Sequence, residues 1–124
     1  MGSRILIIDD QALNAELAEY VLLRAGHEVV VADSAARGFE CIAQARPDLI
    51  LMDIQMPDLD GLEMTRRLKE DPATRGITVI AFTAYAMKGD EERMRAAGCD
   101  GYLAKPIDVK TFADRVAGWL IKRP

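Results

Sequence analysis

Acidic residues directly follow two of the apolar runs in this sequence. Asp9 and Asp10 come after the run 5–8, and Asp53 comes after the run 49–52. Carboxylates that share a partly desolvated cleft repel each other, so such a cleft needs a compensating cation. Carboxylate oxygens favour Mg2+, whereas zinc favours histidine and cysteine ligands, and neither lies beside these aspartates in the sequence. The pattern therefore predicts a magnesium site built from aspartates.

Two further polar residues follow apolar runs later in the chain. Thr83 comes after the run 77–82, and Lys105 comes after the run 101–104. A lysine ammonium is a point charge that suits a phosphoryl oxygen, and a threonine hydroxyl can donate to the same group. Carboxylates, Mg2+, a lysine and a hydroxyl donor are together the groups used in phosphoryl transfer to an aspartate nucleophile.

These residues must be positioned by the alternating elements of the chain. Helical spacing of apolar residues indicates helices, and short apolar runs indicate strands. Strands that alternate with helices form a parallel sheet covered on both faces, and right-handed crossovers make the fold doubly wound α/β. The predicted strands are 5–8, 29–31, 49–52, 77–82 and 101–104, and the predicted helices are 12–25, 34–46, one from Asp60, 86–97 and about 108–121. Ligands bind at the carboxyl ends of such strands, where all the polar residues named above would meet.

Apolar spacing also predicts which side of each helix packs inward. The expected stripes are Leu13, Leu17, Val21 and Leu22 in the first helix, Phe39, Ile42 and Ala43 in the second, and Val109, Phe112, Ala113, Val116 and Leu120 in the last. Asp60 and Glu63 form a possible capping box at the start of the third helix. The position of Trp119 allows two interpretations, a cover for the core edge or a contact for a partner.

With these motifs in order, the chain resembles the response-regulator receiver family, the chemotaxis-receiver type included, over essentially its whole length. The matching residues are Asp9-Asp10, Asp53 within the run 51–61, Thr83-Ala84 and Lys105-Pro106. Each motif alone is weak, but all four stand in order at their own strand ends. The resemblance implies a flavodoxin-like (βα)5 fold with a five-stranded parallel sheet in the order 2-1-3-4-5.

The resemblance also implies the role of each site residue. Asp53 would be the phosphoacceptor. Mg2+ would be held by Asp53, by Asp10 directly, by Asp9 partly through water, and by the carbonyl of Gln55.

Lys105, Thr83 and Ala84 would bind the phosphoryl group, with a cis peptide between Lys105 and Pro106. Tyr102 would be the switch aromatic that turns inward when Thr83 moves. A face built from helix 4, strand 5 and helix 5 would then change shape for a partner.

Two positions that follow these motifs are expected to tune the lifetime of the phosphoryl group. Gln55 is the second residue after Asp53, and Tyr85 is the second residue after Thr83. We hypothesise that the bulky Tyr85 screens the aspartyl phosphate from water and slows its hydrolysis.

Composition limits the class of protein. The chain has 124 residues and a net charge of −4, which fits one receiver domain spanning 1–124 and does not fit direct nucleic-acid binding. Cys41 and Cys99 form no paired motif and are expected to be free thiols in a cytoplasmic protein. No signal peptide or membrane-inserting segment is apparent. Two kinds of partner are expected. A histidine kinase or a phosphotransfer protein would donate the phosphoryl group, and a second protein would be the output target.

Several alternatives stay open. The chain could be a single-domain regulator or a receiver fragment of a larger protein such as a hybrid kinase; in neither case is it an enzyme beyond its own phosphorylation and dephosphorylation. The chain could also be a docking domain that has the receiver fold but binds its partner without phosphorylation. A flavin site is disfavoured because Asp9 and Asp10 would repel a phosphate. A haloacid-dehalogenase-type phosphatase would want an aspartate where Gln55 stands.

Overall fold

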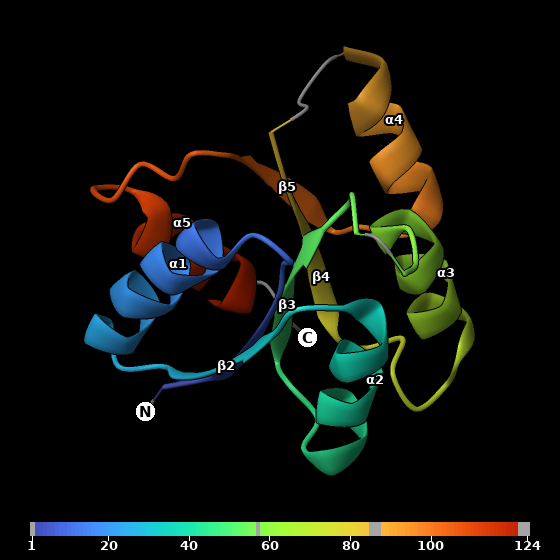
Figure 1. Cartoon of the computed structure of the whole chain (residues 1–124), viewed down its shortest axis with the longest axis horizontal. Helices are drawn as coiled ribbons and strands as arrows, with labels where there is room; N and C mark the ends of the chain where they lie inside the picture. The colour runs from blue at the N-terminus through green and yellow to red at the C-terminus, as the bar shows by residue number, and fades with distance from the viewer. Residues whose placement is uncertain (1, 57, 85–87, 122–124) are drawn as a thin grey trace.

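The computed structural model describes residues 2–56, 58–84 and 88–121. The described residues form five strands that alternate with five helices, and the strands make one parallel sheet in the order β2-β1-β3-β4-β5 (Figure 1). The strands are β1 (Arg4–Ile8), β2 (Glu28–Ala32), β3 (Leu49–Asp53), β4 (Thr78–Thr83) and β5 (Gly101–Ala104), and the helices are α1 (Ala12–Arg24), α2 (Ala35–Gln44), α3 (Gly61–Glu70), α4 (Lys88–Ala97) and α5 (Phe112–Ile121). The predicted flavodoxin-like fold and strand order are confirmed.

Helices cover both faces of the sheet. In Figure 1, α1 and α5 lie on one side of the strands, and α2, α3 and α4 lie on the other. Successive side chains of a strand point to opposite faces. In β1, Ile5 and Ile7 therefore join the core beneath α1 and α5, whereas Leu6 and Ile8 join the core beneath the other three helices. This two-sided burial explains why the central strands read as continuous apolar runs.

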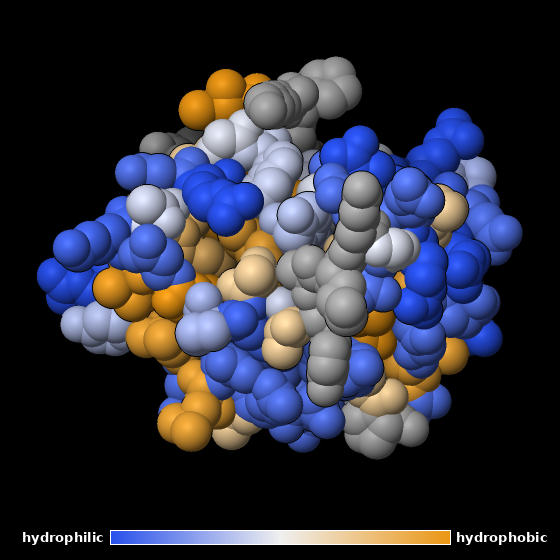
Figure 2. All heavy atoms as spheres, turned by 90° about the horizontal axis from the view of Figure 1, so that it is seen from above, coloured by the Kyte–Doolittle hydropathy of each residue, from blue (hydrophilic) through white to orange (hydrophobic). Residues whose placement is uncertain are grey.

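Helix α1 is present as predicted, and Leu22 is buried and Val21 half-buried as expected, but the first half of the expected stripe does not face the core. Its buried residues are Ala15, Ala18 and Leu22, while Leu13 is 81% exposed and Leu17 is 40% exposed. Figure 2 shows hydrophobic side chains at the surface on the left, the side on which α1 and α5 lie in Figure 1. The helix carries apolar residues on both its inner and outer sides, so periodicity indicated the helix without indicating the whole side that packs.

Helix α5 starts at Phe112, later than the predicted 108. The main-chain carbonyl of Asp108 accepts from the N–H groups of Thr111 and Phe112, and its side chain accepts from the N–H of Lys110. Asp108 thus builds a local turn before the helix, as aspartate side chains commonly do. Val109 lies in this turn and is exposed, so its prediction as an inward residue was wrong.

The starts of α2 and α3 are capped by side chains. Ser34 accepts from the N–H of Arg37, and Asp60 accepts from the N–H of Leu62. Glu63 does not complete a capping box at α3, because its carboxylate forms ion pairs with Arg66 and Arg67 one turn later. In α2, Ile42 is buried and Phe39 half-buried as expected, but Ala43 is exposed, which corrects that prediction.

Trp119 covers the edge of the core. It is half-buried and packs with the cluster beneath α1 and α5, and the Arg115 guanidinium lies 5.8 Å from the centre of its ring. A Cβ on Gly101 would lie 2.7 Å from this ring, so the start of β5 needs a residue without a side chain. The first of the two interpretations of Trp119 therefore holds.

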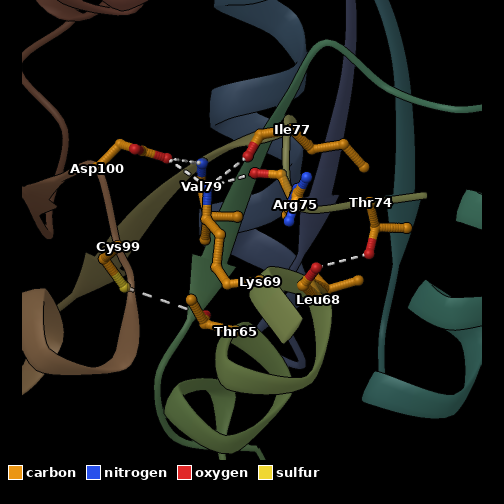
Figure 3. A network of polar contacts seen from close by, with 9 residues as sticks. All are labelled: Thr65, Leu68, Lys69, Thr74, Arg75, Ile77, Val79, Cys99 and Asp100. Carbon is orange, nitrogen blue, oxygen red and sulfur yellow. Dashed lines mark hydrogen bonds and ion pairs between the residues drawn. The ribbon is translucent and has the colours of Figure 1, made fainter. Parts of the chain in front are cut away.

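A lysine at the end of α3 joins three segments at the amino-terminal edge of the sheet (Figure 3). The Nζ of Lys69 donates to the carbonyls of Ile77 and Arg75 at 2.8 and 3.3 Å, and it pairs with Asp100 at 2.9 Å. The same Asp100 oxygen accepts from the N–H of Val79 at 2.8 Å. The network ties α3 to the residues that lead into β4 and β5.

Both cysteines are buried and form no disulfide. Burial raises the pKa of the Cys99 thiol to about 11, against a smaller opposite effect of its hydrogen bond to Thr65. None of the described helices has the length and apolar character needed to cross a bilayer.

Candidate functional site

The predicted site residues meet at the carboxyl-terminal edge of the sheet. Asp9 and Asp10 follow β1, Asp53 is the last residue of β3, Thr83 is the last of β4, and Lys105 follows β5. Oxygens of the three aspartates lie within 4.8 Å of one another. The sequence pattern thus identified side chains that the fold brings together.

Two similar turns orient the aspartates. Asp9 Oδ1 accepts from the N–H of Gln11 at 2.9 Å, and Asp53 Oδ1 accepts from the N–H of Gln55 at 3.1 Å. In each turn an aspartate at the end of a strand, or directly after it, accepts from the main-chain N–H two residues later, a local arrangement that this side chain favours. One oxygen of each carboxylate is therefore fixed by the main chain.

The loop after Asp53 is pinned at both ends. Gly61 donates to the carbonyl of Ile54 at 2.9 Å, and a Cβ on Gly61 would lie 2.1 Å from the carbonyl oxygen of Asp53. Asp58 accepts from the first two N–H groups of α2, those of Ala35 and Ala36, which lower the pKa of its carboxyl. A carboxylate at a helix N-terminus is favourable, so the α2 start anchors the loop.

Lys105 lies between the acidic strand ends. Its Nζ is 2.9 Å from Asp9 Oδ2 and 3.6 Å from Asp53 Oδ1, and its side chain is 7% exposed. The ammonium also lies 5.1 Å from the centre of the Phe82 ring. Its main-chain N–H donates to the carbonyl of Thr83 at 2.8 Å, which continues the β4–β5 pairing, and the peptide bond to Pro106 is cis.

The surroundings of Asp53 favour its neutral form. Burial raises the pKa of Asp53 to about 7. Attraction to Lys105 and the hydrogen bond from Gln55 lower this pKa, whereas the Asp9 charge and the contact with Asp10 raise it. One lysine therefore does not compensate the three carboxylates fully, and an additional positive charge would favour the ionised form.

The residues fit a hard divalent cation. Asp9 Oδ2 is buried and accepts no hydrogen bond from the described residues, so the ion pair with Lys105 is its one polar contact there. Asp10 is exposed, whereas Asp9 and Asp53 are buried, which leaves the cluster open on one side. A hollow of about 380 Å3 beside it is lined by small apolar residues and by the acidic residues Asp9, Asp10, Glu16, Glu19 and Asp33. Carboxylate oxygens with an open side suit Mg2+.

The other predicted residues border the same edge. Thr83 is buried, and Ala84 follows it as an exposed bend. A hollow of about 300 Å3 reaches from Thr83 past Gln55 to Met94 of α4. Tyr102 is half-buried against the core beneath α2, α3 and α4. Tyr85, named above as a residue that tunes lifetime, lies outside the described residues.

One contact of the site was not anticipated from the sequence. The side-chain oxygen of Gln11 accepts from Lys105 Nζ at 3.4 Å. Gln11 directly follows the two aspartates and precedes α1. The sequence held a weak signal for it, since glutamine is not a preferred residue just before a helix.

Comparisons with known proteins agree in fold and family. The family model described as response regulator receiver domain matches residues 5–117. The polar-differentiation response regulator DivK of Brucella anthropi is 42% identical over 120 residues, which cover 97% of this chain and 98% of DivK. A putative response regulator from Chloroflexus aurantiacus has a similar crystal structure, with a TM-score of 0.92, 30% identity and coverage of 98% of this chain and 100% of that one.

A second solved structure bears on the metal. The receiver domain of a sensor histidine kinase from Pseudomonas aeruginosa matches with a TM-score of 0.88 and 31% identity, over 98% of this chain and 100% of that one. Its crystal structure has a magnesium ion coordinated in the active site cleft.

Proposed function

Since this chain belongs to the response regulator receiver domain family, we propose that Asp53 accepts a phosphoryl group from a histidine kinase or a phosphotransfer protein. Receiver domains are signalling domains. The observation that carries the proposal is a buried aspartate, Asp53, which lies beside two further acids and within 3.6 Å of a buried lysine ammonium. A purely structural aspartate would not need this concentration of charge.

The reaction requires the ionised form of Asp53. A carboxylate oxygen attacks the phosphorus of the donor phosphohistidine, the phosphorus–nitrogen bond breaks, and the electron pair leaves with the imidazole. Asp9, Asp10, Asp53 and the Gln55 carbonyl would hold Mg2+, which when bound would supply positive charge near the reacting oxygens. The main-chain N–H of Gln55 holds Oδ1 of Asp53 in place during the attack.

Lys105, Thr83 and Ala84 bind the transferred group in this proposal. The Lys105 ammonium already lies beside Asp53 and can donate to a phosphoryl oxygen from there. Thr83 ends β4 and Ala84 follows it, and β4 is the neighbour of β3 in the sheet. The Thr83 hydroxyl and the Ala84 N–H are donors at the strand edge where negative charge gathers, which is the arrangement that stabilises a phosphoryl group.

The output is a changed protein-docking face made of α4, β5 and α5. Thr83 borders a hollow of about 300 Å3, so its side chain has room to move toward a phosphoryl group. Tyr102 would then turn inward and reshape the face. The rate at which the phosphoryl group is lost is set in part by Gln55 and Tyr85.

We further propose that residues 1–124 act as one cytoplasmic receiver domain, either as a single-domain regulator or within a larger protein. Its target is a protein, since the net charge of −4 would repel nucleic acid.

The test is the intact mass of the chain after incubation with acetyl phosphate and Mg2+. Wild type should gain one phosphoryl group, and Asp53→Ala should gain none. Asp114→Ala, which removes an exposed carboxylate on α5, should gain the group as wild type does. Addition of EDTA should prevent the gain. A wild type that gains no mass from acetyl phosphate or from candidate histidine kinases would contradict the proposal and favour the docking domain that needs no phosphorylation.

A further inference from the structure

The Lys105 ammonium has a neutral partner as well as acidic ones. An ammonium carries three donor hydrogens. Within reach of Nζ are Asp9 Oδ2 at 2.9 Å, Gln11 Oε1 at 3.4 Å and Asp53 Oδ1 at 3.6 Å. Both carboxylates belong to the proposed cation site, whereas Gln11 lies outside that set.

Hydrogen bonds hold both the main chain and the side chain of Gln11. Its main-chain N–H donates to Asp9 Oδ1 at 2.9 Å, and its carbonyl accepts from the N–H of Ala15 at 3.1 Å. Its side-chain oxygen accepts from Asn14 Nδ2 as well as from Lys105. The amide is thus oriented with its oxygen toward the ammonium.

Gln11 does not use its side chain to cap the helix it precedes. No side-chain capping bond is made at the start of α1, although this position favours Ser, Thr, Asp or Asn for that purpose. The side chain turns toward Lys105 instead. Besides the local bond from Asn14, the Gln11 oxygen thus makes a contact that spans 94 positions of the sequence, and through this contact it can act on Lys105.

We propose that Gln11 is a positioning residue, which holds the Lys105 ammonium between Asp9 and Asp53 while Asn14 fixes the Gln11 amide. A cation bound at Asp9 would compete for the carboxylate with which Lys105 is paired, and the neutral Gln11 oxygen would then keep the ammonium beside Asp53. Without the Gln11 oxygen, the carboxylates of Asp9 and Asp53 are the acceptors left for the ammonium among the three named above. The ammonium would then compete more strongly with the cation for these carboxylates. The inference rests on the proposed function of this site.

The experiment is a double-mutant cycle on the affinity for Mg2+, measured by titration calorimetry on the unphosphorylated full chain. The variants are Gln11→Met, Lys105→Met and the combination, with methionine chosen because it keeps the length of each side chain without its polar end. Loss of one hydrogen bond to a charged group should weaken Mg2+ binding about fivefold for Gln11→Met. In the Lys105→Met background the same change should have almost no effect, because the two residues act as a unit.

Two further variants sharpen the cycle. Gln44→Met makes the same chemical change at an exposed position at the end of α2 and should leave the affinity at the wild-type value. Asn14→Leu releases the Gln11 amide and should weaken Mg2+ binding in the same direction, by about twofold.

The proposal is overturned if Gln11→Met binds Mg2+ as wild type does, or if it loses as much affinity in the Lys105→Met background. It is overturned together with the proposed function if wild type binds no Mg2+ at millimolar concentration. If the cycle gives the expected coupling but acetyl phosphate adds no mass to wild type, the positioning role stands and the phosphoryl-acceptor function fails.

Discussion

Two lysines lie at opposite edges of the sheet, and each pairs with an aspartate at 2.9 Å. Lys69 pairs with Asp100 at the amino-terminal edge, and Lys105 pairs with Asp9 at the carboxyl-terminal edge. Around Lys69 the other acceptors are main-chain carbonyls, and Asp100 has a further donor in the N–H of Val79. Around Lys105 the other acceptors are the side chains of Gln11 and Asp53. Three aspartates gather beside this one lysine.

The two edges show how a structural ion pair differs from an ion pair in a proposed binding site. The distances are equal, so distance does not separate them. At the Lys69 edge donors and acceptors match, which stabilises the fold. At the Lys105 edge Asp9 Oδ2 accepts no hydrogen bond from the described residues, and the pKa of Asp53 is raised to about 7 by burial. Such unmatched groups are typical of sites that bind or react.

The largest expected effect comes from Lys105→Met. It removes the positive side chain beside Asp53, so the rate of phosphorylation by acetyl phosphate should fall about 100-fold in saturating Mg2+. Lys69→Met, the matched change at the other edge, should leave that rate within about twofold. Phosphorylation is followed by intact mass against time. If the two variants lost rate equally, the distinction between the edges would be wrong.

The second effect concerns stability. Lys69→Met takes the ammonium donor from the carbonyl of Ile77 and from Asp100, which keeps the N–H of Val79, so the free energy of unfolding should fall by about 2 kcal/mol. Urea denaturation followed by circular dichroism measures the change. Lys69→Arg keeps the positive charge and should lower the free energy of unfolding by less. An equal loss in the two variants would show that packing of the aliphatic part of Lys69, rather than its ammonium, stabilises this edge.

A smaller loss of stability is expected from Gly98→Ala. Gly98 has φ of +106°, and a Cβ there would lie 2.7 Å from Cγ of Lys69. The strained backbone and the contact should lower the free energy of unfolding by about 1 to 2 kcal/mol. Gly89→Ala is the control, because no atom lies within 4 Å of a Cβ at that position. Equal stability of the two variants would argue against a close fit of Lys69 beneath the loop.

The smallest effect has the opposite sign and depends on pH. Without Mg2+, the folded chain keeps a proton on Asp53 between its ordinary pKa near 3.8 and its raised pKa of about 7, whereas the unfolded chain releases it. The free energy of unfolding therefore falls as pH rises through this window. Asp53→Asn cannot titrate, so between pH 4 and pH 5 its stability relative to wild type should rise by on the order of 1 kcal/mol, since one pKa unit corresponds to about 1.4 kcal/mol. Urea denaturation in EDTA at both values tests this, and parallel curves for the two proteins would contradict it.

Much of the fold was predictable because strand signals are local. The apolar runs and the helix stops fixed the order of the elements. In α1 the sequence did not show the whole packed side: Leu13 was expected to face inward and is exposed, and the small Ala15 and Ala18 face the sheet instead. Asp108 was also read as the start of a helix, although its side chain favours a turn.

The site was predictable for a different reason. Asp9, Asp10, Asp53, Thr83 and Lys105 each stand at a strand end, so topology alone brings them to one edge. Gln11 was missed because its contact with Lys105 depends on how the start of α1 is turned. The Lys69 network was not predicted because its acceptors include main-chain carbonyls. Every residue has such a carbonyl, so residue types do not indicate which ones a lysine contacts.

The strand order has a consequence for synthesis on the ribosome. Asp9, Asp10 and Asp53 emerge first, whereas the lysine that pairs with two of them follows β5, the strand made last and placed at the edge of the sheet. A nascent chain that lacks this strand holds its acids without an internal countercharge. Premature termination would therefore leave a fragment that lacks both its edge strand and the lysine of its proposed site.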